Sequence, residues 1–234
     1  MTAATAPISL PPAPPAPRGV VRQPSFTYEN GAEWWHALGD VPLERVILDP
    51  LPGTATEQDL LLFVERDKRL CELVDGTLVE KPVGTEESLI ATQIITAMNT
   101  FATARKLGLV YAPDALMRMQ NGRVRLPDVS FISAARLAAM PKPRPAIYGL
   151  SPDLVVEVLS ASNTKREIEQ KLIEAFASGT RLAWIVDPRS RTVAVHVTAE
   201  EPRETLSDAG TLDGGDVLPG FTLPVRPIFD ADVY

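Results

Sequence analysis

The stretches "RLPDVSFIS" (residues 125–133) and "DLVVEVLSAS" (residues 153–162) are the most informative of this sequence, because each places one carboxylate inside a pattern typical of a buried strand. The second stretch is nearly all aliphatic, as in a strand covered on both faces of its sheet. Asp128 follows Pro127 in the first stretch, and Glu157 stands in the middle of the second. A buried carboxylate costs free energy unless it is paired or bound to a metal ion, so both residues need a compensating charge.

Two helices are predicted next to these strands. Residues 85–106 carry apolar side chains at helical spacing, with acidic residues in the first turn and basic residues in the last. Residues 164–178 show a second apolar stripe, and Gly179 ends it. Thr164 is followed three places later by Glu167, which predicts a capping box between these two residues.

Further strands are predicted from the remaining apolar stretches. "LCELVDGTLVEKP" (residues 70–82) alternates apolar and polar residues on both sides of Asp75-Gly76, a dipeptide that favours a tight hairpin turn. The other predicted strands are residues 107–120, 122–133, 152–160, 182–188 and 192–198. From residue 85 the order is helix, three strands, helix, strand, strand, and a terminal segment at 216–229 is expected to lie against the sheet. This order indicates an α/β domain.

Composition bounds the class of protein. Apolar residues make up 45% of the chain and charged residues 23%, and no run of about 18 apolar residues could cross a bilayer. A single cysteine, Cys71, and a start without a secretion signal predict a cytoplasmic protein that is not in a membrane. The net charge of −7 weighs against broad affinity for nucleic acid, although a local basic patch or metal ions could still bind it.

Three segments are predicted along the chain. Seven of the 22 prolines fall in the first 24 residues, which favours a disordered tail at residues 1–24. Residues 25–66 contain two short helical patterns and are predicted to form a packed extension. Residues 67–234 then form the main domain.

The two strand-borne carboxylates are the strongest candidates for chemistry. Each has an ordinary alternative: Asp128 as an aspartate of a turn, and Glu157 as a salt-bridged glutamate at the rim of a sheet. If they converge, they form a hard oxygen site suited to Mg²⁺, which binds through one or two carboxylates plus water and substrate phosphate.

Lys171 stands beside the apolar stripe of its predicted helix, so it either reaches inward or covers the core with its aliphatic stem. His36 and His196 are predicted to be structural, because they lie far apart and one cysteine offers no zinc spacing. Trp34 and Trp35 are predicted to pack the extension rather than to stack on bases.

The chain resembles the Uma2 family, a restriction-endonuclease-like branch of the PD-(D/E)XK nuclease superfamily. The resemblance runs from residue 72 to residue 221, through "CELVDGTLVEKP", "RVRLPDVSFIS", "PDLVVEVLSASNTKREIEQKL", "ASGTRLAWIVDPRSRTVAVH" and "DVLPGFTLP". It implies an αβββαβ core with a mixed central sheet flanked by helices, to which the N-terminal helical or hairpin extension is added.

The resemblance also implies an activity. Asp128 matches the aspartate of the PD motif and Glu157 the second acid, while the usual lysine two places later is replaced by Leu159. Lys171 fits the helix lysine of Uma2-like sequences, and Glu87 is a weaker match to a polar residue that points toward the site.

By this resemblance, Asp128, Glu157 and the Val158 carbonyl would bind Mg²⁺, or Mn²⁺, in an endonuclease that hydrolyses phosphodiester bonds of DNA. The sequence does not fix the oligomeric state; a homodimer is one option, since many nucleases of this fold pair up to cut both strands. Two alternatives remain: a nuclease-fold protein that has lost catalysis and serves as a binding or scaffolding module, and a structural oligomer with charged rim residues.

Overall fold

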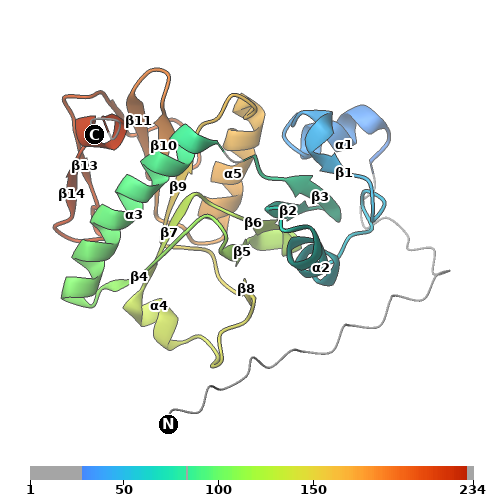
Figure 1. The fold of residues 1–234 in the computed structure, drawn as a ribbon, viewed down its shortest axis with the longest axis horizontal. Coiled ribbons are helices and arrows are strands. Elements are labelled where there is room, and N and C mark those ends of the chain that lie inside the picture. Colours follow the sequence, from blue (N-terminus) through green and yellow to red (C-terminus); the bar gives the residue numbers. More distant parts are fainter. Residues whose placement is uncertain (1–27, 83, 231–234) are drawn as a thin grey trace, which may run out of the picture.

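The computed structural model describes residues 28–82 and 84–230 and contains two six-stranded sheets with helices packed around them (Figure 1). The tail predicted at residues 1–24 lies outside the described residues. Within the described part of the chain, no helix is long and apolar enough to span a membrane.

The first sheet follows the order β1-β3-β2-β6-β5-β8. Its strands are β1 (Val46–Ile47), β2 (Cys71–Val74), β3 (Thr77–Glu80), β5 (Leu116–Arg118), β6 (Val124–Arg125) and β8 (Ile147–Tyr148). The hairpin between β2 and β3 turns at Asp75 and Gly76, whose φ angles are 47° and 71°. Both positive φ values belong to the tight turn that the Asp-Gly dipeptide predicted.

The second sheet follows the order β12-β11-β10-β9-β7-β4. Its strands are β4 (Gly108–Tyr111), β7 (Val129–Ser133), β9 (Leu154–Val158), β10 (Leu182–Asp187), β11 (Thr192–His196) and β12 (Glu204–Leu206). A separate small sheet pairs β13 (Thr211–Asp213) with β14 (Thr222–Pro224). The second sheet is mixed, because β9 pairs parallel to β10 and antiparallel to β7.

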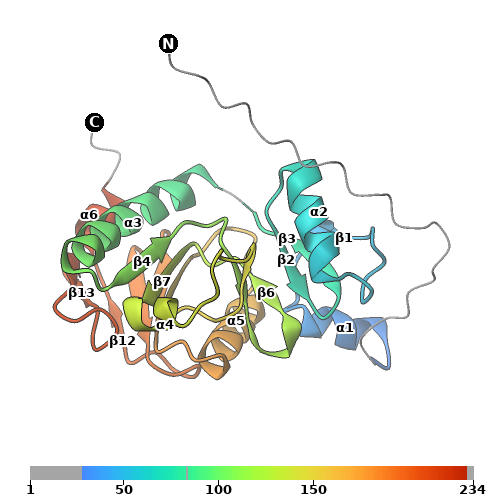
Figure 2. The ribbon, with the colours of Figure 1, turned by 90° about the horizontal axis from the view of Figure 1, so that it is seen from below.

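Helices cover the sheets. They are α1 (Gly31–Ala37), α2 (Glu57–Asp67), α3 (Thr85–Arg105), α4 (Ala134–Ala138), α5 (Lys165–Ala177) and α6 (Arg226–Phe229), with 3₁₀ turns η1 (Leu43–Arg45) and η2 (Gln120–Gly122). In the view of Figure 2 the second sheet lies between α3 and α5. Met98 of α3 packs with Val156 and Trp184 on one face, and Leu172 of α5 packs with Val155 on the other. Strand β9 is therefore buried on both faces, as its aliphatic sequence predicted.

The predicted order of helix, three strands, helix and strand is present as α3, β4, β7, β9, α5 and β10. Two of the predicted strands nevertheless break in the middle. Residues 107–120 divide into β4 and β5, and residues 122–133 divide into β6 and β7, so that β5 and β6 join the other sheet. Pro127 lies at the second break, where a residue without a backbone N–H cannot continue a ladder. Helix α4 and strand β8, which the sequence did not predict, lie between β7 and β9.

The N-terminal segment packs on the first sheet. Strand β1 pairs with β3, and Leu60 and Phe63 of α2 share an apolar cluster with Leu73 and Leu78 of the β2–β3 hairpin. Figure 1 shows α2 beside this hairpin, away from the second sheet. The segment predicted as an extension therefore shares a core with the domain.

The C-terminal segment packs on the second sheet. Leu218 and Phe221 belong to the apolar cluster that lies under α3, together with Trp184. The predicted contact of residues 216–229 with the sheet is present in the structure.

Candidate metal and phosphate site

Asp128 and Glu157 lie opposite each other at the junction of the two sheets. In the antiparallel pair of β7 and β9, Val129 is the partner of Val156. One step further along this register places Asp128 opposite Glu157, and residues opposite each other in an antiparallel pair project from the same face. Both carboxylates therefore reach the same place from two neighbouring strands.

The two acids line one small pocket. Its volume is about 60 Å³, and a single ordered water needs roughly 10–15 Å³ by the same measure, so it can hold a small ion with a few water molecules. Charged and polar residues dominate its wall, namely Arg45, Lys81, Glu87, Ser88, Asp128, Glu157, Ser160, Asn163 and Lys171. Val158, whose carbonyl was predicted as a ligand, also lines it.

Asp128 is fixed by two donors. The backbone N–H of Val158 donates a hydrogen bond of 2.6 Å to its Oδ2, and Lys81 Nζ lies 2.8 Å from its Oδ1. Lys81 also donates to the Leu126 carbonyl. The N–H and C=O of one strand residue point to the same side, so the Val158 carbonyl faces the side of Asp128.

Glu157 is paired with Lys171. Lys171 Nζ lies 3.1 Å from Glu157 Oε2 and 3.3 Å from Glu72 Oε1, and all three side chains are buried. Of the two alternatives that the sequence left open for Lys171, the inward direction is the one found. Its alternative, a stem that covers core surface with the ammonium in water, does not describe this residue.

The pKa values of this group reflect its burial and its charges. Burial raises the pKa of Glu157 to about 7, although Lys171 opposes the effect. Burial alone would lower the pKa of Lys171, but the carboxylates of Glu157 and Glu72 raise it well above its ordinary value. Burial would likewise raise the pKa of Glu72, but Lys171 and Arg125 hold it well below its ordinary value. Lys171 is therefore a permanent cation at neutral pH.

A chain of alternating charges continues behind the pocket. Glu72 accepts hydrogen bonds from Arg125 Nη1 at 2.8 Å and from the Leu126 N–H at 3.1 Å. Arg125 in turn donates from two nitrogens to Glu174 of α5, at 2.7 and 2.8 Å. These bonds connect β2, β6 and α5, so the segment that leads from β6 to Asp128 is tied to the helix that carries Lys171.

Glu87 lies at the edge of the pocket. It stands in the first turn of α3 and its carboxylate folds back over Gly84, where an added Cβ would lie only 1.7 Å from Glu87 Oε2. A carboxylate in that position interacts favourably with the helix N-terminus. Glu87 therefore lines the site without joining the group around Asp128 and Glu157.

Lys81, Glu72 and Arg125 were not predicted as site residues. Glu72 carried a usable signal, because it is a charge in the middle of a strand whose residues are all buried, as Glu157 is. Lys81 follows the last residue of β3 and no spacing rule identifies it.

The donors present fit a divalent cation. Asp128 and Glu157 supply carboxylate oxygens and Val158 a carbonyl, the hard ligands that Mg²⁺ prefers. Among the residues that the structure describes, no group of three His, Cys, Asp or Glu side chains could hold a metal ion. Mg²⁺ is commonly bound by two carboxylates, with water and substrate phosphate completing its coordination, whereas zinc requires more protein ligands.

Comparison with known proteins identifies the family and the fold. A family model named Uma2 and described as "Putative restriction endonuclease" matches residues 57–226, a range that includes Lys81, Asp128, Glu157 and Lys171. Among solved structures, a putative nuclease belonging to DUF820 from Anabaena variabilis ATCC 29413 is 17% identical, with a TM-score of 0.63. The similarity covers 70% of this chain and 92% of that one, and it confirms the predicted nuclease-like α/β fold. No curated protein matches the chain.

Proposed function

Since this chain belongs to the Uma2 family, we propose that it is a Mg²⁺-dependent endonuclease that hydrolyses phosphodiester bonds of DNA, with Mn²⁺ as an effective substitute. One observation carries the proposal. Asp128 and Glu157 project from the same face of neighbouring strands into a pocket that also contains two lysines. Buried acids and cations at one small pocket are the parts that metal-assisted phosphoryl chemistry requires.

Asp128, Glu157 and the Val158 carbonyl would hold the metal ion. When bound, a divalent cation supplies positive charge to the phosphate and lowers the pKa of a coordinated water. The chain itself keeps these ligands in place, because the Val158 N–H binds Asp128 and Lys171 binds Glu157. The strands therefore present both acids without needing to rearrange.

The two lysines would act on the phosphate. Because the pKa of Lys171 is raised, its ammonium stays protonated and serves as a hydrogen-bond donor rather than as a general base. It would neutralise charge that develops on the phosphate oxygens and orient the attacking water. Lys81, beside Asp128, adds a second cation to the pocket.

Local charge makes a polyanion acceptable despite the net charge of −7. Lys81, Lys171 and Arg45 line the pocket beside three carboxylates, Glu87, Asp128 and Glu157, so the pocket does not share the negative excess of the whole chain, and a bound metal ion would make it positive. Cleavage of both DNA strands would use two copies of the chain, and the free thiol of Cys71 is compatible with the cytoplasm.

Plasmid cleavage tests the proposal. Purified protein with Mg²⁺ or Mn²⁺ should nick supercoiled plasmid, and EDTA should stop the reaction. Asp128→Asn should reduce cleavage at least about a hundredfold. The control variant Asp216→Asn changes an exposed aspartate elsewhere and should cut normally. Cleavage that persists in EDTA or in Asp128→Asn contradicts the proposal.

One observation favours a second candidate, a nuclease-fold module that binds without cutting. Lys81 already neutralises Asp128 in the structure, so the acid pair forms part of a complete salt-bridge network. This candidate predicts DNA binding that is unchanged by EDTA and no cleavage with either metal.

A further inference from the structure

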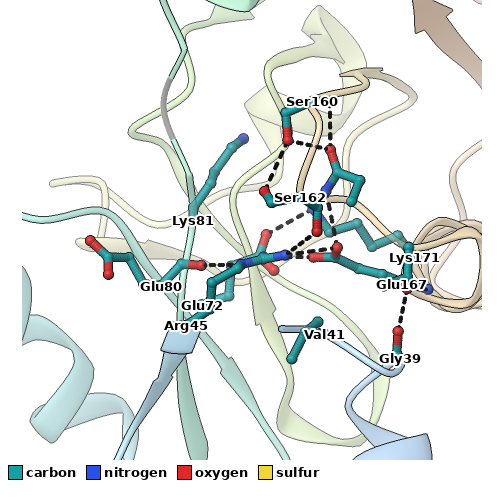
Figure 3. Close-up of polar contacts among 12 residues, drawn as sticks. Gly39, Val41, Arg45, Glu72, Glu80, Lys81, Ser160, Ser162, Glu167 and Lys171 are labelled. Atoms are coloured by element: carbon teal, nitrogen blue, oxygen red, sulfur yellow. Dashed lines mark hydrogen bonds and ion pairs between the residues drawn. The ribbon is translucent and has the colours of Figure 1, made fainter. Parts of the chain in front are cut away.

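Arg45 connects three segments that border the pocket, and it lies outside the residues that the family model matches. Its side chain is buried, with 6% of its surface exposed. Arg45 Nη1 and Nη2 bind Glu167 Oε2 and Oε1 at 2.9 and 2.7 Å. Its Nε donates to the Glu80 carbonyl at 2.9 Å, and Nη1 also reaches the Ser162 carbonyl at 3.4 Å. Figure 3 shows the guanidinium between Glu80 and Glu167, with Ser162 above it.

Each of these partners stands next to a residue of the site. Glu80 precedes Lys81, and Glu167 lies one helical turn before Lys171 on α5. Ser162 belongs to the loop whose neighbours Ser160 and Asn163 line the pocket. Arg45 therefore contacts the backbone of the residue before Lys81 and the helical turn before Lys171.

The contacts of Arg45 identify its kind of role. A guanidinium has five N–H donors, and Arg45 makes four hydrogen bonds to protein oxygens of the described residues. Little donor capacity is left for a substrate phosphate, although Arg45 lines the pocket. The bidentate geometry fixes Glu167 in direction as well as in distance.

Glu167 passes this constraint to the pocket wall. It also accepts a hydrogen bond of 3.0 Å from Asn163 Nδ2, and Asn163 Oδ1 accepts one of 2.8 Å from the Ser160 N–H. Because Glu167 binds Arg45 and Asn163, its carboxylate does not close the capping box that the sequence predicted; the Thr164 side chain alone caps α5. The predicted capping box is therefore incomplete because the Glu167 carboxylate is used in contacts at the pocket wall.

Other contacts hold the same N-terminal segment on α5. Thr164 donates to the Gly39 carbonyl, and Gln170 Nε2 donates to the His36 carbonyl at 2.8 Å. An added Cβ at Gly39 would lie 2.6 Å from the Glu167 Cα, so only glycine permits this approach. The segment from His36 to Arg45 therefore packs against the first two turns of α5.

We propose that Arg45 is a positioning residue of the site, which holds the Lys81 strand end, the 160–163 loop and the first turn of α5 in one arrangement. This inference rests on the proposed nuclease function for its catalytic consequence. The N-terminal segment from His36 to Arg45 then contributes to the geometry of the site and does not only extend the domain.

Two measurements on the full chain test the proposal. In plasmid cleavage, Arg45→Met and the milder Glu167→Gln should each lower kcat by about 10- to 100-fold while KM changes less than about threefold. Arg45→Lys, which cannot form the bidentate pair, should recover only part of the loss. In hydrogen exchange without metal, the backbone amides of residues 79–82 and 159–171 should exchange faster in Arg45→Met than in the wild type. The exchange rates of β10 and β11 should be unchanged.

The matched control is Arg118→Met, which breaks another bidentate arginine–glutamate pair, with Glu57, at 2.7 Å for both bonds. It should leave kcat and exchange at residues 159–171 as in the wild type. The proposal is overturned if Arg45→Met and Glu167→Gln behave like Arg118→Met. If the wild-type chain cuts nothing, the nuclease proposal fails, and the exchange measurement alone decides whether Arg45 holds these segments.

Discussion

Lys81 Nζ lies 2.8 Å from Asp128 Oδ1, so the lysine that follows β3 of the first sheet neutralises the carboxylate that precedes β7 of the second sheet. Both side chains are largely buried, at 7% and 14% exposure, so the Coulombic attraction between them is larger than in an exposed pair. A metal ion bound by Asp128 would share that carboxylate with Lys81. The ammonium and the metal ion therefore compete for the same negative charge.

Replacing Lys81 should separate metal binding from cleavage. In Lys81→Met the competing cation is gone, so Mn²⁺ should bind about tenfold more tightly, equivalent to about 1.4 kcal/mol. Cleavage should nevertheless fall at least about tenfold, because the second cation facing the phosphate is lost. Calorimetric titration with Mn²⁺ and plasmid cleavage measure the two effects. Lys165→Met, at a side chain that is 91% exposed, is the control. Weaker Mn²⁺ binding in Lys81→Met would contradict the competition.

The raised pKa of Glu157 predicts how stability depends on pH. Burial raises this pKa from the ordinary 4.5 to about 7, so between these values the folded chain keeps a proton that the unfolded chain has released. The resulting stabilisation is complete below about pH 4.5 and is lost as the pH rises through about 7. Glu157→Gln cannot titrate and should lack this loss.

Urea unfolding in EDTA at pH 5 and pH 8 measures the effect. The free energy of unfolding of the wild type, minus that of Glu157→Gln, should decrease from pH 5 to pH 8. Saturating Mg²⁺ should flatten this decrease, since a bound cation lowers the pKa of the carboxylate. A difference that stays constant with pH in EDTA would show that Glu157 is not protonated in the folded chain at pH 5.

Much of this fold could be predicted because its signals are local. The Asp75-Gly76 turn, the N-cap at Thr164 and the aliphatic run of β9 each depend on a few adjacent residues. The place of Lys171 beside an apolar helix stripe left two alternatives, an inward ammonium or a stem that covers the core, and the structure shows the first. These features need no knowledge of which segments meet in space.

The remainder depends on contacts between distant segments. Arg45 and Glu167 are 122 positions apart, and nothing near Arg45 in the sequence marks it as buried. Pro127 favours the beginning of a strand, but nothing in the sequence shows that the residues before and after it belong to different sheets, because both halves of residues 122–133 have strand-like composition. The contact between Lys81 and Asp128 depends on this change of sheet, since Asp128 lies where the chain leaves the first sheet, to which β3 and the neighbouring Lys81 belong.

Lys171 should be essential for stability as well as for cleavage. Its ammonium is shared by two buried carboxylates, Glu157 and Glu72, so Lys171→Met would leave two buried acids without their common partner. The free energy of unfolding should fall by about 3–5 kcal/mol at pH 8. The loss should be smaller at pH 5, where Glu157 can take up a proton. Urea unfolding measures it, and Lys165→Met on the same helix should stay within about 0.5 kcal/mol of the wild type. Equal effects of the two variants would show that the buried contacts of Lys171 do not contribute.

Binding of Mg²⁺ should stabilise the folded chain through Asp128. A ligand that binds only the folded state adds RT ln(1 + [L]/Kd), which is about 2.7 kcal/mol when Mg²⁺ is present at 100 times its Kd. The unfolded chain cannot bind comparably, because Asp128 and Glu157 are brought together only by the pairing of β7 with β9. Thermal unfolding in Mg²⁺, compared with NaCl of the same ionic strength, should show a rise in Tm that grows with the logarithm of Mg²⁺ concentration. Asp128→Asn should lose this rise and Asp216→Asn should keep it. The same Mg²⁺ stabilisation in Asp128→Asn would place the cation elsewhere and remove Asp128 from the ligand set, whatever the cleavage assay showed.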